Sequence, residues 1–416
     1  MKNTATREFI RSCFRDCVGG DVLILQFMGL YSMGDIFRDN EPRWYYWEAA
    51  PFIFGLGTIT LALIFDIRNI YDTAQVDFML SIEVAAATFT VALVLFKGYR
   101  IWFHRKELYH LLEVCYNRWN MQASRNFITE SALENAKKTR LLRICYTLSI
   151  IGAVGSYSLR PYLLYLKFHF SQTNDSFDFS ETVYPAHYPF TLNSFTQYFL
   201  CATWENIGLY FLTLWWISAD CLFAQLTTYF AVEFNILANE IRYIDPAEST
   251  TLDTNKIMAE LKRIVREHVK LFSCVHALEE WYNPIIFATI LLNGLNLCSV
   301  LYSLQYRIAE NNWRDVIKNM SHVTAVVTQT VLFCSYAQSL SDEINGFRQA
   351  VYGCSWTNFS LTTKSVILLI MIHTEHEYKY SAYGLLDLNM PQATTIFSTA
   401  MRFFTLLRSI THKDHI

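Results

Sequence analysis

Charged residues are scarce in this sequence. Of its 416 residues, 17% are Asp, Glu, Lys or Arg, whereas a soluble protein of this size carries about 25%. Hydrophobic residues make up 52% and aromatic residues 16%, and the mean hydropathy is positive. This composition excludes an ordinary soluble domain and indicates a protein embedded in a membrane. The formal net charge of −3 gives no support to a nucleic-acid partner or an acidic partner.

The motifs of the common enzyme classes are also missing. The sequence contains no Gly-rich phosphate loop, no Ser/His/Asp pattern and no Cys-x-x-Cys pair. His373 and His376 could share one helix face, but no third metal ligand accompanies them. We therefore expect no enzyme, no cofactor and no metal site. The first 21 residues mix both charges without an uninterrupted apolar core, so we expect no cleaved signal peptide and a cytosolic N-terminus.

Seven apolar segments are near the length of about 20 residues that a bilayer requires. The fourth is too long for one crossing, and we expect its helix to continue beyond the membrane. A further apolar run at 365–373 is too short to cross; we expect a helix packed in a cytosolic assembly, with a shallow re-entrant segment as the alternative. The seven predicted spans are residues 47–66, 77–97, 144–166, 193–231, 283–304, 321–340 and 390–410.

The distribution of Lys and Arg predicts the orientation. Of the 34 such residues, 25 lie on the side of the N-terminus and eight on the other side, with Arg402 inside the last span. The N-terminus is therefore expected inside and the C-terminus outside, opposite to a G-protein-coupled receptor. Sequons at Asn174 and Asn319 lie in predicted outer loops and are the candidate glycosylation sites, whereas Asn358 would be cytosolic. No cysteine lies in these outer loops, so the usual outer disulfide of such receptors is excluded.

Polar, small and aromatic residues gather at one depth in spans two to four and predict a ligand chamber. Glu83 and Glu205 would each cost a few kcal/mol in lipid, so either a water-accessible cavity or hydrogen-bonded pairs must hold them. An apolar chamber with a few hydroxyls suits a small volatile or lipid-like ligand, and plain helix packing is the alternative for each residue. The aromatic outer loop at 167–191 is expected either to cover the chamber or to rest on the helix ends. The candidate ligand-binding residues are Thr88, Phe89, Gly152, Ser156, Tyr157, Tyr198, Phe199, Trp204 and Glu205.

The last span carries a stripe of polar residues. In lipid, a helix hides hydroxyl groups against neighbours or exposes them to water. The stripe is about 21 Å long at 1.5 Å per residue, so several copies around one axis would enclose a water-filled pore. Arg402 opposes cations and must tilt aside, pair with an acid or occur in few copies; a packing seam is the alternative reading of the stripe. On one helix face lie Thr395, Ser398, Thr399, Arg402, Thr405 and Ser409.

The end of the chain resembles the insect odorant receptor family. The marks are YGCSW at 352–356, the apolar run SVILLIMIH at 365–373 and TIFSTAMRFFTLLRS at 395–409, together with seven spans and an inside N-terminus. The Thr-Tyr and Gln-Phe pairs that end the related gustatory receptors are replaced here by Met401-Arg402 and Arg408-Ser409. The resemblance implies an all-α protein of the plasma membrane of sensory neurons that forms a four-subunit, ligand-gated, non-selective cation channel.

The resemblance also implies the roles of the parts. Residues 1–46 would form a cytosolic tail with an interfacial helix, 47–340 the first six spans and the ligand chamber, 341–389 a cytosolic helical anchor and 390–416 the pore helix with a short extracellular tail. The chain is expected to be a ligand-tuning subunit, with a small volatile ligand, an odorant co-receptor and membrane lipid as partners. The alternatives are an inverted seven-span metabotropic chemoreceptor or a gustatory-type channel. Alignment with the co-receptor places the outer constriction at Thr405 and Ser409, among the pore residues Thr395, Ser398, Arg402, Thr405, Arg408 and Ser409.

Overall fold

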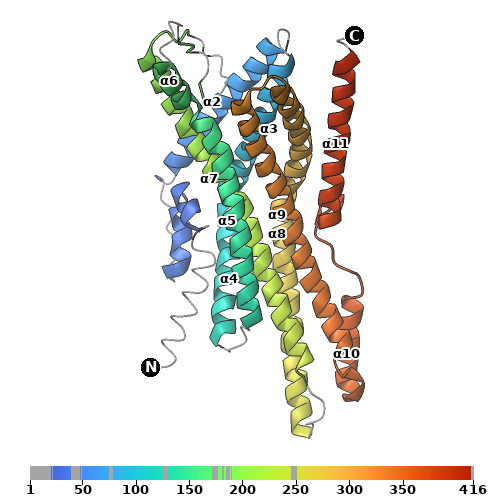
Figure 1. Ribbon diagram of the computed structural model, residues 1–416. Helices are drawn as coiled ribbons and strands as arrows, with labels where there is room; N and C mark the ends of the chain where they lie inside the picture. The colour runs from blue at the N-terminus through green and yellow to red at the C-terminus, as the bar shows by residue number, and fades with distance from the viewer. Residues whose placement is uncertain are drawn as a thin grey trace.

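The computed structural model describes residues 20, 22–38, 47, 49–74, 78–124, 130–170, 177–179, 182–183, 188, 190–244 and 251–413. These residues form long helices that run roughly alongside one another, with one short β-hairpin before the last helix (Figure 1). The elements in chain order are η1 (Tyr31–Arg38), α2 (Ala49–Thr73), α3 (Phe78–Phe103), α4 (Arg105–Ser124), α5 (Glu130–Ser158), α6 (Arg160–Phe170), α7 (Phe195–Arg242), α8 (Thr251–Ala309), α9 (Trp313–Gly353), η4 (Trp356–Asn358), α10 (Leu361–His373), β1 (Ser381–Ala382), β2 (Leu386–Asp387) and α11 (Met390–Lys413).

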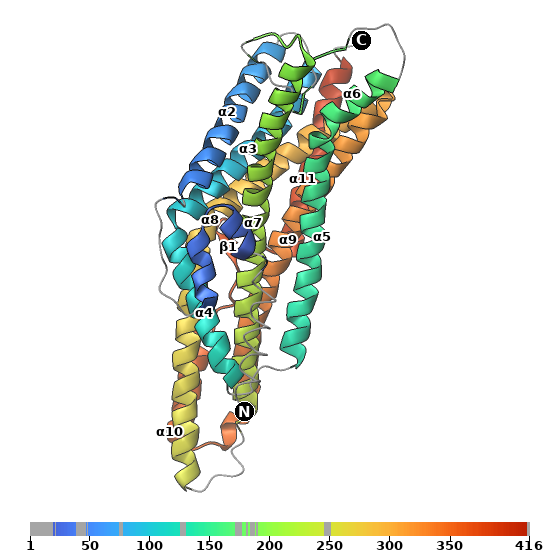
Figure 2. The same cartoon turned by 90° about the vertical axis from the view of Figure 1, so that its left-hand side faces the viewer.

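Helix α7 forms the centre of the bundle. It is 48 residues long and packs against α2, α3, α5, α8 and α9. Figure 2 shows α7 in the middle, with α2 and α3 on one side and α5 and α9 on the other. Its residues are apolar on all faces and most are buried, as expected for a helix surrounded by others. The predicted continuation of this helix past residue 231 is present, because α7 ends at Arg242.

Helices α8 and α9 extend well beyond the ends of α2 and α5 and form a narrower lower bundle with α7 (Figure 1). The predicted helix at 365–373 is present as α10, which packs against α8 and α9 near their lower ends. From there the chain returns through the β-hairpin to α11. Helix α11 stands at the edge of the molecule and contacts α8 and α9.

Five of the described helices are long and apolar enough to cross a membrane: α2, α3, α5, α7 and α8. The sixth and seventh predicted spans fall within α9 and α11, which are continuous helices but carry more polar side chains. The third predicted span, 144–166, is divided, because α5 ends at Ser158 and α6 begins at Arg160. Pro161 explains the division, since proline lacks an N–H and fits the first turn of a helix but disrupts its interior.

Candidate functional site

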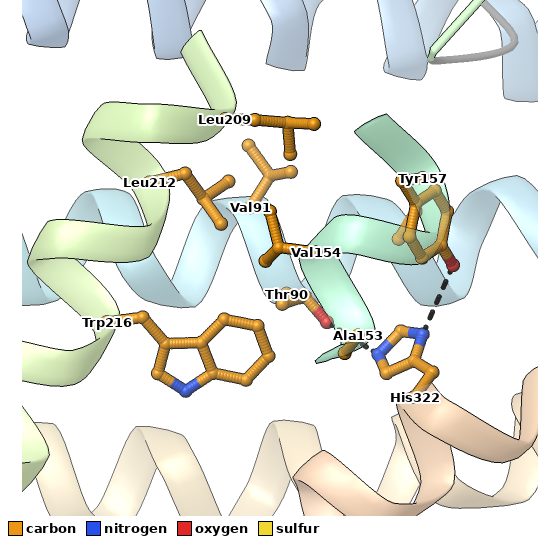
Figure 3. A pocket seen from close by; sticks show the side chains of 10 residues that line it. Thr90, Val91, Ala153, Val154, Tyr157, Leu209, Leu212, Trp216 and His322 are labelled. Atoms are coloured by element: carbon orange, nitrogen blue, oxygen red, sulfur yellow. Dashed lines mark hydrogen bonds between the residues drawn. The ribbon is translucent and has the colours of Figure 1, made fainter. Parts of the chain in front are cut away.

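A cavity of about 50 Å³ lies inside the bundle, between α3, α5, α7 and α9 (Figure 3). Most of its wall is aliphatic or aromatic, because the inner faces of these four helices are apolar. The polar groups gather at one corner, where α3, α5 and α9 meet. The lining residues are Ala87, Thr90, Val91, Ala153, Val154, Tyr157, Leu209, Leu212, Trp216 and His322.

His322 is the centre of the polar corner. Its side chain is buried, and Nε2 lies 3.2 Å from Thr90 Oγ1 and 3.3 Å from Asn296 Nδ2. On the other side of the ring, Nδ1 lies 3.4 Å from the Tyr157 hydroxyl. Figure 3 marks this hydrogen bond with a dashed line. The four side chains come from α9, α3, α8 and α5, so this hydrogen-bond network joins four helices at one wall of the cavity.

The structure brings one of the predicted ligand-binding residues, Tyr157, to the cavity wall. Thr88 is buried nearby, but its hydroxyl donates to Val84 O of its own helix at 2.8 Å, and Phe89 is half-buried outside the wall. Gly152 is exposed on the outer face of α5. Ser156 lies 3.2 Å from Ser321 Oγ, in the seam between α5 and α9.

The predicted residues of α7 lie farther along the helix, in an outer aromatic cluster. Tyr198 is fully buried, with its ring edge-on to that of Phe177 at 5.2 Å between centroids. Phe199 packs edge-on against Tyr165 at 5.2 Å, and Trp204 is 40% exposed. Tyr198 and Phe199 contact α6, through Pro161 O and the Tyr165 ring, whereas Trp204 packs edge-on against Phe54 of α2. All three lie at a distance along α7 from the cavity-lining Trp216.

Glu205 belongs to a second, much smaller cavity of about 20 Å³, which Asp66 of α2 also lines. Its carboxylate accepts hydrogen bonds from Thr182 Oγ1 at 2.9 Å, from the Val183 backbone N–H at 2.8 Å and from the Tyr188 hydroxyl at 2.5 Å. Residues of the predicted outer loop therefore cover this end of α7. Of the two predicted environments for Glu205, a water-accessible cavity or hydrogen-bonded partners, the structure shows the hydrogen-bonded partners.

Glu83 is likewise paired. Its carboxylate accepts a hydrogen bond from Arg307 Nη2 at 2.8 Å and forms an ion pair with Lys318. These partners come from the facing ends of α8 and α9. Spacing along the sequence could not reveal them, since they lie more than 220 residues away.

The polar stripe of α11 faces away from the rest of the chain. Thr395, Ser398, Thr399, Arg402 and Thr405 are all exposed. The opposite face packs through Ala393, Ala400 and Phe397, of which the last two lie against Leu297 of α8 and Val326 of α9. The side chains of the predicted pore residues Arg408 and Ser409 lie outside the described residues.

One of the two candidate glycosylation sites, Asn319, is buried in the structure. Asn319 lies within α9, is 2% exposed and donates a hydrogen bond to Ser303 Oγ at 2.9 Å. A glycan requires an exposed acceptor, so the prediction for Asn319 is wrong. The reason is that α9 begins at Trp313, before the predicted sixth span at 321, so the sequon lies inside the helix and its asparagine packs within the bundle. Asn174 lies outside the described residues.

A larger cavity of about 430 Å³ lies outside the predicted spans, between α8, α9 and α10. His268 contributes to its wall, on the part of α8 that precedes the fifth predicted span, and stacks on Phe347 with ring centroids 4.5 Å apart. Burial, and to a lesser degree His373, lowers the pKa of His268 to about 4, so its ring is neutral at pH 7. Because residues 341–389 are predicted to form a cytosolic helical anchor, the cavity between the spans is the better ligand candidate.

Sequence reasoning missed Thr90, Trp216 and His322. A histidine at the start of an apolar segment was an available signal, since ionisable residues in spans usually face the bundle interior. Depth alone did not identify Thr90, because it is two residues from Thr88 and points to another face of α3.

Comparisons with known proteins agree with this architecture. The family model for 7tm odorant receptors matches residues 77–401. Odorant receptor 47a of Drosophila melanogaster is 20% identical over 390 residues, which is 90% of this chain and 95% of that protein. Odorant receptor 13a of the same species is 24% identical over 209 residues, so this chain spans only 50% of that relative.

The fold is also known from solved structures. Olfactory receptor OR5 of the insect Machilis hrabei, in complex with eugenol, matches with a TM-score of 0.76 at 12% identity, covering 99% of this chain and 100% of that one. A second OR5 structure matches with a TM-score of 0.73. These matches show the same helical membrane fold, and the relatives are receptors rather than enzymes. Because the family model matches most of its length, the chain belongs to the insect 7tm odorant receptor family.

Proposed function

We propose that the chain is a ligand-tuning subunit of an odorant-gated, non-selective cation channel and that it acts with an odorant co-receptor in the plasma membrane of sensory neurons. The cavity between α3, α5, α7 and α9 is its odorant chamber. Helix α11 contributes to the shared pore of a tetramer, with the N-terminus inside and the C-terminus outside. The presence of eugenol in the OR5 complex supports a small volatile ligand.

The uncovered polar face of α11 is the observation that carries this proposal. A hydroxyl-rich helix face exposed to lipid is unfavourable, and no described part of this chain covers it. From Thr395 to Thr405 the face extends about 15 Å at 1.5 Å per residue. Copies of α11 around one axis would turn these faces toward a common water column. In a heteromer, fewer than four copies of Arg402 would face the cations.

The size of the chamber supports gating by expansion. At about 50 Å³ it is smaller than the roughly 150 Å³ cavity that holds benzene, so an odorant must enlarge it. A ligand opens the channel only if it binds the open state more tightly than the closed one. Helix α9 lines the chamber through His322 and packs against α11 through Val326, so a displaced α9 acts on the pore helix.

The experiment that tests the proposal is the odorant-evoked current in excised membrane patches, without cytosolic nucleotide. Patches from cells with the chain and the co-receptor are compared with patches that contain either protein alone. We expect current from the pair only. No current in any patch, with surface delivery confirmed and a nucleotide-dependent response in intact cells, would instead favour the metabotropic alternative.

A further inference from the structure

Two acidic side chains share the smaller cavity, at the predicted outer side of the bundle. Asp66 of α2 and Glu205 of α7 both line this space of about 20 Å³, and the two residues are 1% and 5% exposed. None of the eight described residues that line it is Lys, Arg or His, so the wall supplies no positive side chain. Two carboxylates buried side by side without a counter-charge are strongly unfavourable.

The two carboxyl groups differ in their hydrogen bonds. Three donors bond to the oxygens of Glu205: the hydroxyls of Thr182 and Tyr188 and the backbone N–H of Val183. Asp66 Oδ2, in contrast, is buried and has no hydrogen-bond partner within the described part of the chain. A buried polar atom in a native protein normally has a partner, so this oxygen indicates a bound group that the chain itself does not supply.

From this we infer that the small cavity is a cation site, which binds one calcium ion between the carboxylates of Asp66 and Glu205. A divalent cation offsets both charges and bonds to Asp66 Oδ2 as well. A proton on Asp66 would remove one charge but would leave Oδ2 without a partner among the described residues. The site is separate from the odorant chamber and goes beyond the proposed function.

The ligand atoms and the size of the cavity favour calcium over other cations. Four lining side chains present oxygen, which Ca²⁺ prefers: both acids, Thr58 and Tyr188. The Thr58 hydroxyl donates to Gly55 O at 2.9 Å, so its oxygen faces a cation as an acceptor. A space of about 20 Å³ holds roughly one water-sized particle, so the ion must enter largely dehydrated. Mg²⁺ gives up its water reluctantly, and a monovalent ion would offset only one carboxylate.

The position of the cavity indicates where the ion comes from and what it connects. The loop at 167–191 is predicted on the outer side and contributes Tyr188 to the wall, so the ion would enter from the extracellular fluid. Extracellular calcium sites commonly bind with a Kd of about 10⁻⁴–10⁻³ M. The ion would tie α2 to α7 and to this loop. We expected no metal site from the sequence, because Asp66 and Glu205 belong to no metal-binding motif and lie on separate helices.

Thermal unfolding of the detergent-purified chain, with calcium alone as the probe, tests this site. We expect about 10 mM CaCl₂ to raise the unfolding temperature by roughly 3 °C or more relative to EGTA, and the same concentration of MgCl₂ to raise it much less. Asp66→Asn and Glu205→Gln should each abolish the calcium shift. The matched control is Asp72→Asn on the same helix, since Asp72 lies outside the wall, pairs with Arg68 and should keep the shift. Calorimetric titration should give one calcium ion per wild-type chain.

The outcomes separate the calcium site from the proposed channel function. Absence of a calcium shift in the wild type overturns the site, and so does a shift that persists in both Asp66→Asn and Glu205→Gln. A wild type that is stabilised by acidification but not by calcium would show that a proton holds the pair, which also overturns it. These measurements record binding to the purified chain, so their failure leaves the proposed function untouched. Absence of odorant-evoked current from the chain with its co-receptor contradicts the proposed function and leaves the calcium site standing.

Discussion

A fully buried ion pair fixes α3 against α7. Lys97 Nζ lies 2.6 Å from Asp220 Oδ1, and both side chains are 0% exposed. Asp220 also accepts hydrogen bonds from Gln329 Nε2 at 2.6 Å and from the Tyr146 hydroxyl. The four residues belong to α3, α7, α9 and α5, so one carboxylate holds together the helices that surround the chamber.

The two partners are not equivalent, and this gives a ranked prediction. Asp220→Asn removes the counter-charge of the buried Lys97 and leaves beside it a neutral amide and the Phe333 ring at 5.6 Å, so we expect the free energy of unfolding to fall by about 3–5 kcal/mol. Lys97→Met leaves Asp220 with two neutral donors, Gln329 and Tyr146, which still stabilise the carboxylate. The lysine variant should therefore be the more stable of the two. The double variant should match it, since removing the cation removes the cost of the lost carboxylate.

Thermal unfolding of the detergent-purified chain, followed by fluorescence-detected size exclusion, measures this order across the wild type, both single variants and the double variant. We expect Asp220→Asn to unfold at the lowest temperature. If Lys97→Met unfolds at the same or a lower temperature, or if the two effects add in the double variant, the assignment of the unequal roles is wrong.

Three further predictions test other parts of the structure. Thr405→Leu narrows and dries the proposed pore, so it should lower current or alter ion selectivity without changing the rank order of odorants; a changed rank order with unchanged conduction would refute the pore assignment. Because the pKa of His268 is lowered to about 4, the folded state binds a proton less readily than the unfolded state, and the free energy of unfolding should fall by at most about 2 kcal/mol between about pH 7.5 and about pH 5. The unfolding temperature of the wild type should therefore fall over this pH range, and His268→Phe should remove that contribution to the fall. Gly98→Ala should cost about 1–3 kcal/mol, because the new Cβ would overlap the Trp215 indole, whereas Gly57→Ala meets open space and serves as the control; equal unfolding temperatures for both would contradict the packing.

The sequence predicts the helices well, because their signal is local. The length of α7 and the existence of α10 follow from uninterrupted apolar runs, and the polar face of α11 follows from helical spacing. The only local signal for the division after Ser158 is Pro161. A proline is not a sufficient signal, because Pro284 lies inside the continuous helix α8. Local pattern therefore identifies the elements more reliably than it identifies the ends of the spans.

The site is harder to predict, because its residues are paired across the bundle. The second predicted span ends at Lys97, since a lysine usually marks the membrane edge, yet α3 continues and buries this lysine completely. Its partner Asp220 lies 123 residues away, and His322 meets Thr90 across 232 residues. Composition and depth indicated that polar groups need partners, but the rotation of each helix decides which partners meet.

In the proposed channel, the position of α9 would couple the chamber to the pore helix α11. Near one end, Lys318 is tied to the carboxylate of Glu83, and about three turns farther along, Gln329 is tied to the buried network. His322 lies between these fixed points and faces the chamber, and one turn later Val326 faces Ala400 of α11. Polar ties at both positions oppose sliding of α9 along its axis, so in the proposed channel an expansion of the chamber at His322 would displace this segment sideways. That movement would reach α11 through Val326 and Ala400, and no described residue covers the polar face of α11.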